Sequence, residues 1–314
     1  MSWVSTLESA GHLGEAVTHF NEALDFLERD GTEVNATRCL SDALNKIQAE
    51  WSLLDNVEMG EVKTFQTMLQ VELDPEDQAT FLCSDEVGRL LRLEPRIMNH
   101  DALKRHGYRP GVEIDAKLVQ KASEVHRQAQ SLLAAFRTKG TEEARTRLLK
   151  RVAELLYIVR SNIAHGEKTP RGPDHEKAER DRAVSKLVIP VQLLLINLLL
   201  DRPDERLVVY GTLAPGQPNH RMIEDLDGEF SCCSVRGLIS ETDGLPCFAW
   251  GPAQDEVEAQ LFGSRQLSDR WGSLDRFEGR GYKRRLIPAT TGGRLAVATI
   301  YVSTADDWWS RWDH

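Results

Sequence analysis

The pattern of apolar residues changes once along the chain, near residues 202–206, and this change constrains the fold more than any other feature. Before it, apolar residues recur three and four positions apart in segments such as "DAKLVQKASEVHRQAQSLLAAF", which predicts amphipathic helices. After it, short segments such as "RLVVYGTL" and "RLAVATIYV" are rich in Val, Ile, Leu and Thr, which predicts β-strands. Helices first and strands afterwards indicate two separate domains of the α+β class rather than one sheet of alternating strands and helices.

We therefore expect an all-α domain over residues 1–203 and a second domain, built mainly of strands, over residues 204–314. Two domains also suit the length of 314 residues, because single domains usually have about 100–200 residues. In the first domain, Thr141 followed by Glu142 and Glu143 predicts a helix start, with a capping residue and then acids that suit the helix dipole. In the second domain, "SRQLSDRWGSLDRFEG" predicts the one clear helix among the strands.

The formal charge of the chain is −10 at pH 7, and the acidic excess is spread over both domains. Up to residue 200 there are 26 basic and 31 acidic residues, and after it there are 13 and 18. Broad, sequence-independent binding of nucleic acid needs a basic face, so this balance argues against it. A local basic pocket stays possible.

The cysteines and the apolar segments indicate a cytoplasmic protein without a membrane span. The five cysteines are odd in number and lack C-x-x-C spacing, which argues against a disulfide framework and a zinc site and favours reduced thiols. The N-terminus "MSWVSTLESAGHLGEAVTHF" has neither the basic start nor the apolar stretch of a signal peptide. The most apolar run, Leu187–Leu200, contains Pro190 and is short for a bilayer, so we expect a buried helix.

In the first domain, the stretch "LLYIVRSNIAHGEKTP" ends an apolar helix with Arg160 and His165. Five residues correspond to about 140° around a straight helix, so the two side chains can converge only if the helix ends between them. Gly166 is a residue that commonly ends a helix. An arginine that grips phosphate and a histidine that exchanges protons near neutral pH are together sufficient to cleave RNA without a metal ion.

This motif, within residues 155–168, resembles the R-x4-H signature of the HEPN superfamily. The resemblance implies a helical bundle that pairs as a homodimer, and in many members a metal-independent ribonuclease of toxin–antitoxin or antiviral systems. It implies catalytic roles for Arg160 and His165, supporting roles for Asn162 and Lys168, and RNA and an antitoxin or other protein as partners. Two alternatives stay open: Arg160 caps the helix while His165 lies on the surface, or the fold serves only for assembly.

In the second domain, the segment "RLVVYGTLAPGQPNH" predicts a buried strand that runs into a loop containing Gly and Pro. Such a turn can direct successive backbone N–H groups at an anion. Glu278 follows at the end of the predicted helix, before "GRG" and Tyr282. A single carboxylate beside an anion-binding turn suits a reaction with one proton shuttle, and partial burial would raise the pKa of Glu278.

Several motifs in this order resemble the γ-glutamylcyclotransferase-like, or AIG2-like, family: "YGTL", "GLP", "VEAQLFG", "LDRFEG" with "YKR", and "AVATIYV". The resemblance implies a small β-barrel with a cavity, and an enzyme that converts a γ-glutamyl amide to 5-oxoproline and a free amine. It implies that Glu278 transfers the proton, that Tyr282 lines the pocket, and that no metal or cofactor takes part. The substrate would be held by four residues of the loop: Tyr210, Gly211, Thr212 and Leu213.

Three functional hypotheses follow from the two resemblances. In the first, Arg160 and His165 cleave RNA while the barrel binds or processes a γ-glutamyl-type ligand. In the second, Glu278 is the only chemical centre and the helical domain is a dimerisation scaffold. In the third, both domains are non-catalytic binding modules of a regulatory assembly.

Overall fold

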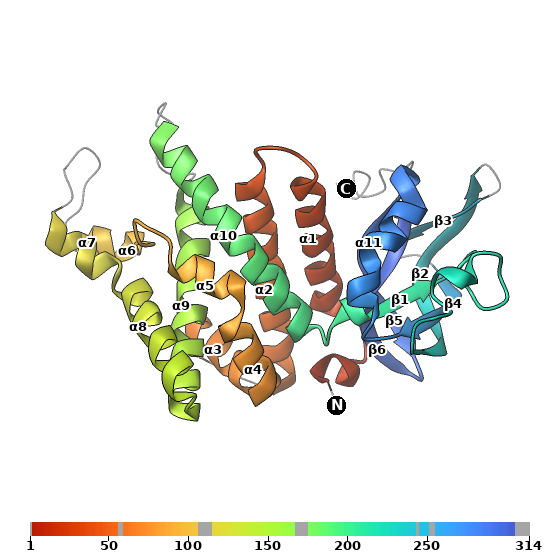
Figure 1. Ribbon diagram of the computed structural model, residues 1–314, viewed down its shortest axis with the longest axis horizontal. Helices are drawn as coiled ribbons and strands as arrows, with labels where there is room; N and C mark the ends of the chain where they lie inside the picture. Colours follow the sequence, from red (N-terminus) through yellow and green to blue (C-terminus); the bar gives the residue numbers. More distant parts are fainter. Residues whose placement is uncertain are drawn as a thin grey trace. The chain divides into compact units, whose positions relative to one another are not determined.

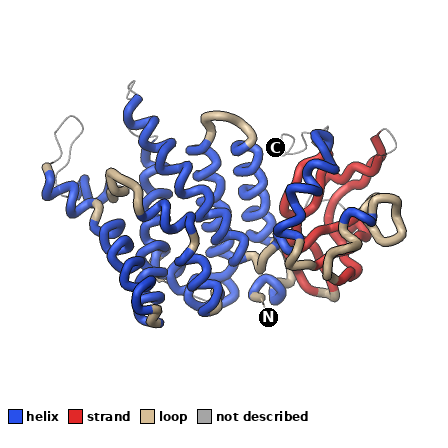
Figure 2. Tube along the Cα trace, in the orientation of Figure 1, coloured by secondary structure: helices blue, strands red, loops and turns tan. Residues whose placement is uncertain are grey.

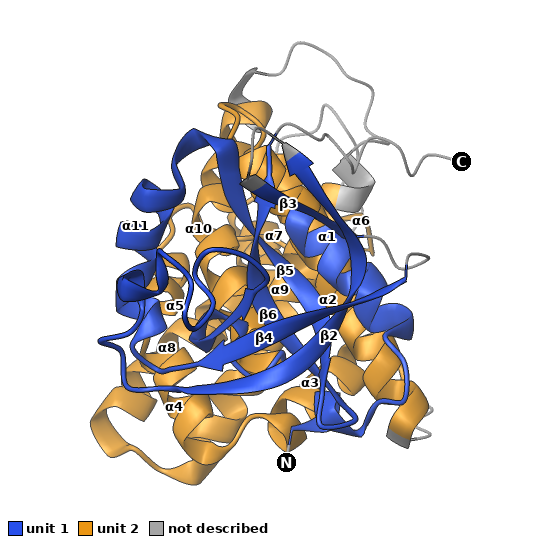
Figure 3. Ribbon diagram, turned by 90° about the vertical axis from the view of Figure 1, so that its right-hand side faces the viewer, with its two compact units in different colours: residues 1–21, 200–314 blue, residues 22–199 orange. Residues whose placement is uncertain are grey.

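A computed structural model describes residues 2–55, 59–105, 115–166, 175–242, 245–250 and 255–304 of the chain. These residues form two compact units, which are coloured separately in Figure 3. Unit 1 combines residues 1–21 with residues 200–314, and unit 2 consists of residues 22–199. The boundaries expected from the sequence, 1–203 and 204–314, therefore differ from the structure chiefly at residues 1–21, which belong with the strands.

Unit 2 is helical throughout its described part, as the ribbon and the tube trace show (Figures 1 and 2). Helix α1 (Gly11–Leu27) starts in unit 1 and ends in unit 2. The helices that follow in unit 2 are α2 (Glu33–Asp55), α3 (Glu61–Glu72), α4 (Pro75–Cys83), α5 (Asp85–Leu91), α6 (His100–Arg105), α7 (Ala116–Ala122), α8 (Glu124–Lys139), α9 (Glu142–Gly166) and α10 (His175–Leu199). Three of these helices, α4, α5 and α6, are short, and Asp74 caps α4 by accepting from the N–H groups of Glu76 and Asp77.

Helix α10 contains the apolar run and supplies core residues to unit 2. Within its stretch Ala178–Leu199, an 18-residue window has a mean hydropathy of 1.6, and by length and composition alone this stretch could cross a membrane. Val188, Val191 and Leu195 are fully buried, and α10 packs against α2 and α5. Gln192 also lies inside and donates a hydrogen bond to the Ser41 hydroxyl of α2 (2.9 Å). The expected buried helix is therefore present, and its apolar side chains face other helices of the same unit.

Unit 1 contains a closed β-barrel. Its strands are β1 (Arg206–Val209), β2 (Glu229–Thr242), β3 (Leu245–Trp250), β4 (Glu256–Gly263), β5 (Tyr282–Thr291) and β6 (Arg294–Ser303). They pair in the order β3-β2-β4-β1-β6-β5, and β2 also pairs with β5 through Ser234–Thr290 and Val235–Ala289, which closes the sheet on itself. Only β1 and β6 are parallel among the described pairs.

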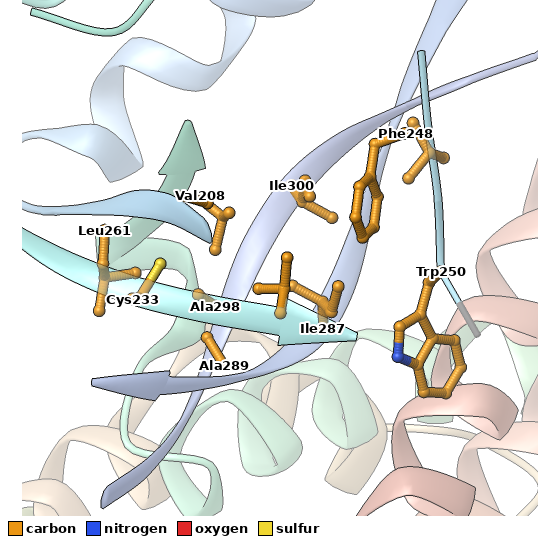
Figure 4. Packing of buried hydrophobic residues seen from close by; sticks show 12 residues of the cluster. Val208, Cys233, Phe248, Trp250, Leu261, Ile287, Ala289, Ala298 and Ile300 are labelled. Carbon is orange, nitrogen blue, oxygen red and sulfur yellow. The ribbon is translucent and has the colours of Figure 1, made fainter. Parts of the chain in front are cut away.

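The two faces of the barrel strands have separate apolar clusters. On one face, side chains from all six strands gather between the strands, among them Val208, Phe248, Ile287 and Ile300 (Figure 4). On the other face, Leu207 and Val209 pack with residues of α11 (Leu267–Glu278). Consecutive residues of a strand point to opposite faces, so the apolar run of β1 serves both clusters. This double burial fixes the end of β1 and the last turn of α11, which meet at the candidate site.

The first 21 residues are part of the barrel unit. A 3₁₀ helix, η1 (Trp3–Thr6), packs against β6 and buries Trp3 and Val4. In α1, Asn21 is completely buried and uses both ends of its amide on the backbone of Leu286 in β5. Its Nδ2 donates to the Leu286 carbonyl and its Oδ1 accepts from the Leu286 N–H, both at 2.9 Å. One side chain thus replaces a neighbouring strand at this position.

Candidate active site

A cavity of about 180 Å³ opens in unit 1 where β1, the loop after it, the end of α11 and the start of β5 meet. The six residues that the sequence analysis selected in the strand half all line it: Tyr210, Gly211, Thr212, Leu213, Glu278 and Tyr282. The volume lies below the roughly 300–1,000 Å³ of pockets for drug-sized ligands. The cavity therefore suits a small group such as a single amino acid.

Glu278 is the last residue of α11 and the single charged side chain among the residues that line this cavity. Gly279 follows with φ 66° and ψ −157°, a backbone conformation that favours glycine, and this residue lets the chain leave the helix directly after the carboxylate. Burial raises the pKa of Glu278 to about 7. In the described part of the chain no group donates a hydrogen bond to its carboxylate. At neutral pH this carboxyl group is therefore ready both to accept and to return a proton.

The loop after β1, which lines the same cavity as Glu278, offers three consecutive backbone donors. The carbonyls of Gly211 and Thr212 accept hydrogen bonds from the N–H groups of Ala214 and Asn219, at 3.1 and 3.0 Å. The N–H groups of Gly211, Thr212 and Leu213 have no acceptor among the described residues. Successive N–H groups without an acceptor can form an anion-binding site that carries no formal charge of its own.

Glycine is needed at position 211 because Pro246 covers it. A Cβ atom at Gly211 would lie 2.8 Å from the Cγ of Pro246, which is closer than carbon atoms normally approach. Pro246 also lines the cavity and accepts a hydrogen bond at its carbonyl from the Tyr282 hydroxyl (3.1 Å). The loop is held from its other end by His220, whose Nδ1 lies 3.1 Å from the Leu213 carbonyl. His220 thus stabilises the turn.

Two tyrosines of the predicted site are fixed by hydrogen bonds to the backbone. The Tyr210 hydroxyl donates to the Tyr301 carbonyl (2.7 Å), and burial above all raises the pKa of Tyr210. Burial, together with Cys247 and the charge of Glu278, raises the pKa of Tyr282 to about 12. Both phenols therefore stay protonated at neutral pH, so they can form hydrogen bonds but do not readily release a proton.

Sequence reasoning missed six other lining residues: Val208, Val209, Asn219, Pro246, Phe277 and Tyr301. Pro246 and Phe277 stand inside the motifs "GLP" and "LDRFEG", so their positions next to the selected residues were the available signal. Tyr301 lies in the last strand, 91 residues from Tyr210 in sequence, and only the pairing of β1 with β6 brings it to the cavity. The described residues contain no group of three or more His, Cys, Asp or Glu side chains that could hold a metal ion.

In the helical unit, the structure does not give the expected geometry for Arg160. Helix α9 continues to Gly166 instead of ending between Arg160 and His165, so the two positions lie about 140° apart around one helix. Arg160 forms an ion pair with Glu61 of α3 at 2.5 Å, and Glu61 also accepts from the Tyr157 hydroxyl at 3.1 Å. The helix ends at Gly166, as the sequence indicated, and the condition for the two side chains to converge, a helix end between residues 160 and 165, is not met.

The other residues of the R-x4-H motif have different outcomes. The Asn162 side chain donates to the Met98 carbonyl (2.7 Å) and accepts from the His100 N–H (3.3 Å), so it holds the segment before α6. The side chain of His165 and the whole of Lys168 lie outside the described part of the chain. Of the four motif residues, the structure thus assigns contacts to Arg160 and Asn162, and both sets of contacts are internal to unit 2.

Comparison with known proteins gives one family match, to part of the chain. Residues 207–312, about a third of the chain, match the family model "Gamma-glutamyl cyclotransferase, AIG2-like". None of the curated proteins compared with the chain matches it. The match does not include the helical unit.

Three solved structures resemble the chain at 21% sequence identity. YkqA from Bacillus subtilis has a TM-score of 0.28 over 32% of this chain and 36% of its own, so the chain spans little more than a third of that protein. An uncharacterized protein from Pyrococcus horikoshii has a TM-score of 0.25 over 32% and 79%. An AIG2-like protein from Mus musculus has a TM-score of 0.27 over 34% and 82%. The closed barrel and the family match together support an AIG2-like domain of the gamma-glutamyl cyclotransferase type over residues 207–312.

Proposed function

We propose that unit 1 is a γ-glutamyl cyclotransferase in which Glu278 moves the proton. The observation that carries this proposal is the arrangement of one cavity, in which a carboxyl group with a pKa of about 7 shares the space with three unpaired backbone N–H groups. The reaction needs one group that accepts and returns a proton and one that stabilises negative charge on oxygen. Glu278 and the loop residues Gly211, Thr212 and Leu213 supply these two functions.

The reaction is an intramolecular transfer of the γ-glutamyl acyl group. The α-amine of the substrate attacks its own γ-carbonyl carbon, and Glu278 accepts one proton from the amine as the new C–N bond forms. The N–H groups of the loop stabilise the negative charge on the carbonyl oxygen. Glu278 then gives the proton to the departing nitrogen, the old C–N bond breaks, and 5-oxoproline and a free amine leave. No proton is gained or lost over the cycle.

Release of 5-oxoproline is the direct test of this proposal. The intact protein would be incubated with γ-glutamyl amides and γ-glutamyl peptides, and 5-oxoproline and the released amine would be measured together. We expect equal amounts of both products from at least one substrate. A γ-glutamyl compound that binds but is recovered unchanged would instead support the third hypothesis, a binding module without turnover.

The ribonuclease activity implied by the HEPN resemblance stays a prediction. In the described part of unit 2, the guanidinium group of Arg160 is neutralised by Glu61, so a phosphate would have to displace this carboxylate. The prediction is tested by incubating the protein with labelled total RNA and tRNA in EDTA. Cleavage that the Arg160→Ala/His165→Ala variant lacks would support the first hypothesis. If wild type and this variant give the same RNA pattern, unit 2 would keep only the role of a dimerisation scaffold, as in the second hypothesis.

A further inference from the structure

The last turn of α11 is attached to the barrel by the side chain of Asp275. Its carboxylate accepts hydrogen bonds from the Arg284 Nε at 2.7 Å and Nη2 at 3.0 Å, and from the Tyr301 hydroxyl at 2.8 Å. Arg284 belongs to β5 and Tyr301 to β6, so one carboxylate joins the helix to two strands. Three charge-assisted hydrogen bonds, two of them from one guanidinium fork, make a geometrically specific connection.

Asp275 and Glu278 lie on the same side of α11. Residues three apart on a helix are neighbours on its surface, and Gly279 ends the helix by donating its N–H to the Asp275 carbonyl. The Glu278 carboxylate itself receives no hydrogen bond from a described residue. Its position therefore depends on the backbone of the last helical turn, and Asp275 is the residue that ties this turn to the strands.

Two further contacts extend the attachment along the helix. The Arg284 guanidinium lies over the ring of Trp271, 5.0 Å from its centre, one helical turn before Asp275. The Trp271 Nε1 donates to the Asp204 carbonyl at 2.8 Å. The Tyr301 side chain also belongs to the cavity wall. Tyr301 thus both connects α11 to the barrel and borders the space in which Glu278 lies.

We propose that Asp275, held by Arg284 and Tyr301, is a positioning residue that fixes Glu278 against the loop residues 211–213. This inference rests on the proposed cyclotransferase function and assigns a role to three residues outside the proton transfer itself. A proton-transfer group must be within hydrogen-bond reach of the reacting nitrogen, and a shift of about 1 Å costs roughly 100-fold in rate. The side-chain bonds of Asp275 limit such a shift.

The role is tested by three variants and one matched control. Tyr301→Phe removes the hydroxyl group and keeps the ring in the cavity wall. Asp275→Asn keeps an oxygen that accepts from Tyr301 and loses the ion pair, whereas Asp275→Ala loses both. The control is Asp225→Asn, which breaks the ion pair of Asp225 with Arg270 on the same helix, at the end away from Glu278.

We expect kcat for 5-oxoproline release to fall about 10- to 100-fold in Tyr301→Phe and further in Asp275→Ala, with KM within about 3-fold of wild type. Asp275→Asn should lie between wild type and Asp275→Ala, and Asp225→Asn should keep the wild-type kcat. A kcat that changes no more in Tyr301→Phe and Asp275→Asn than in the control would overturn the positioning role. A rise in KM alone would overturn it as well.

A second measurement separates this inference from the proposed function. Hydrogen–deuterium exchange of the backbone N–H groups of residues 275–281 needs no substrate. If wild type releases no 5-oxoproline, the proposed function fails, and the exchange data still decide whether Asp275 holds the end of α11. Faster exchange in Tyr301→Phe and Asp275→Asn than in Asp225→Asn supports the attachment, and equal exchange contradicts it. Thermal unfolding of each variant identifies any general loss of structure.

Discussion

Glu278→Gln is expected to reduce kcat for 5-oxoproline release by about 10³-fold, within the 10²- to 10⁴-fold that general acid–base catalysis contributes. The amide has nearly the size and shape of the carboxylate but cannot accept the proton of the α-amine and return it to the leaving nitrogen. KM should change little, because the loop N–H groups still bind the substrate. Glu278→Asp is the control, because it keeps the carboxyl group on a side chain that is shorter by one carbon. We expect a smaller loss of kcat in this variant than in Glu278→Gln. A Gln variant with wild-type kcat would exclude Glu278 as the proton carrier.

The pH dependence of the wild-type enzyme follows from the same group. The carboxyl group must be ionised to accept a proton, and burial raises its pKa to about 7. Activity should therefore rise with pH between about 6 and 8 and level off above that range. Ionisation of Glu278 controls this acidic side of the pH profile. The rise should be absent from the residual activity of Glu278→Gln. The measurement is kcat/KM for 5-oxoproline release across this range.

The raised pKa also predicts that Glu278→Gln makes the protein more stable at alkaline pH. In the unfolded chain a glutamate ionises with a pKa of about 4.3, whereas in the folded protein the pKa of Glu278 is about 7. Between these values the folded state binds more protons, so the contribution of Glu278 to stability falls as pH rises and reaches its lowest level above pH 7. The side chain is partly exposed, so we expect a gain of about 1–2 kcal/mol for the Gln variant at pH 8 and almost none at pH 4. Urea unfolding at both pH values measures it.

The candidate site in the barrel was largely predictable because its residues stand in short, ordered motifs. A strand that runs into a Gly-containing loop, and a carboxylate at a helix end before glycine, are local patterns, and local patterns can be read from one sequence. Tyr301 and Arg284 were not predictable in the same way. Their positions near the site depend on the pairing of β6 with β1 and β5. The register between strands that are distant in sequence cannot be predicted from the residues of one strand alone.

The helical unit shows both the strength and the limit of periodicity. The start of α9 was predicted from Thr141, whose hydroxyl accepts from the Ala144 N–H at 3.3 Å, and the helix does begin at Glu142. Its last residue is Gly166, the residue that the sequence indicated as ending the helix. The contact of Arg160 was not predicted, because its partner Glu61 lies in another helix, 99 residues away in sequence.

Residues 1–21 were assigned to the helical domain because their local pattern is helical. One contact that attaches them to the barrel joins Asn21 to Leu286, 265 residues away. An asparagine on an amphipathic helix is ordinarily expected at the surface or near a helix end. Nothing in the adjacent residues indicates that its amide lies fully buried beside a strand, so this part of the fold needed the structure.

Asn21→Ala should therefore destabilise unit 1 by about 2–5 kcal/mol. The substitution leaves the N–H and the carbonyl of Leu286 without their partners in a buried place, and each unsatisfied group costs about 1–3 kcal/mol. Urea unfolding, followed by the tryptophans of unit 1, measures the loss as a lower midpoint of its transition. Asn35→Ala, at an exposed position of α2, is the matched control and should change stability by less than about 0.5 kcal/mol. If the two variants unfold alike, Asn21 does not complete the barrel. If Asn21→Ala alone loses stability, the AIG2-like domain depends on residues that lie outside its matched range of 207–312.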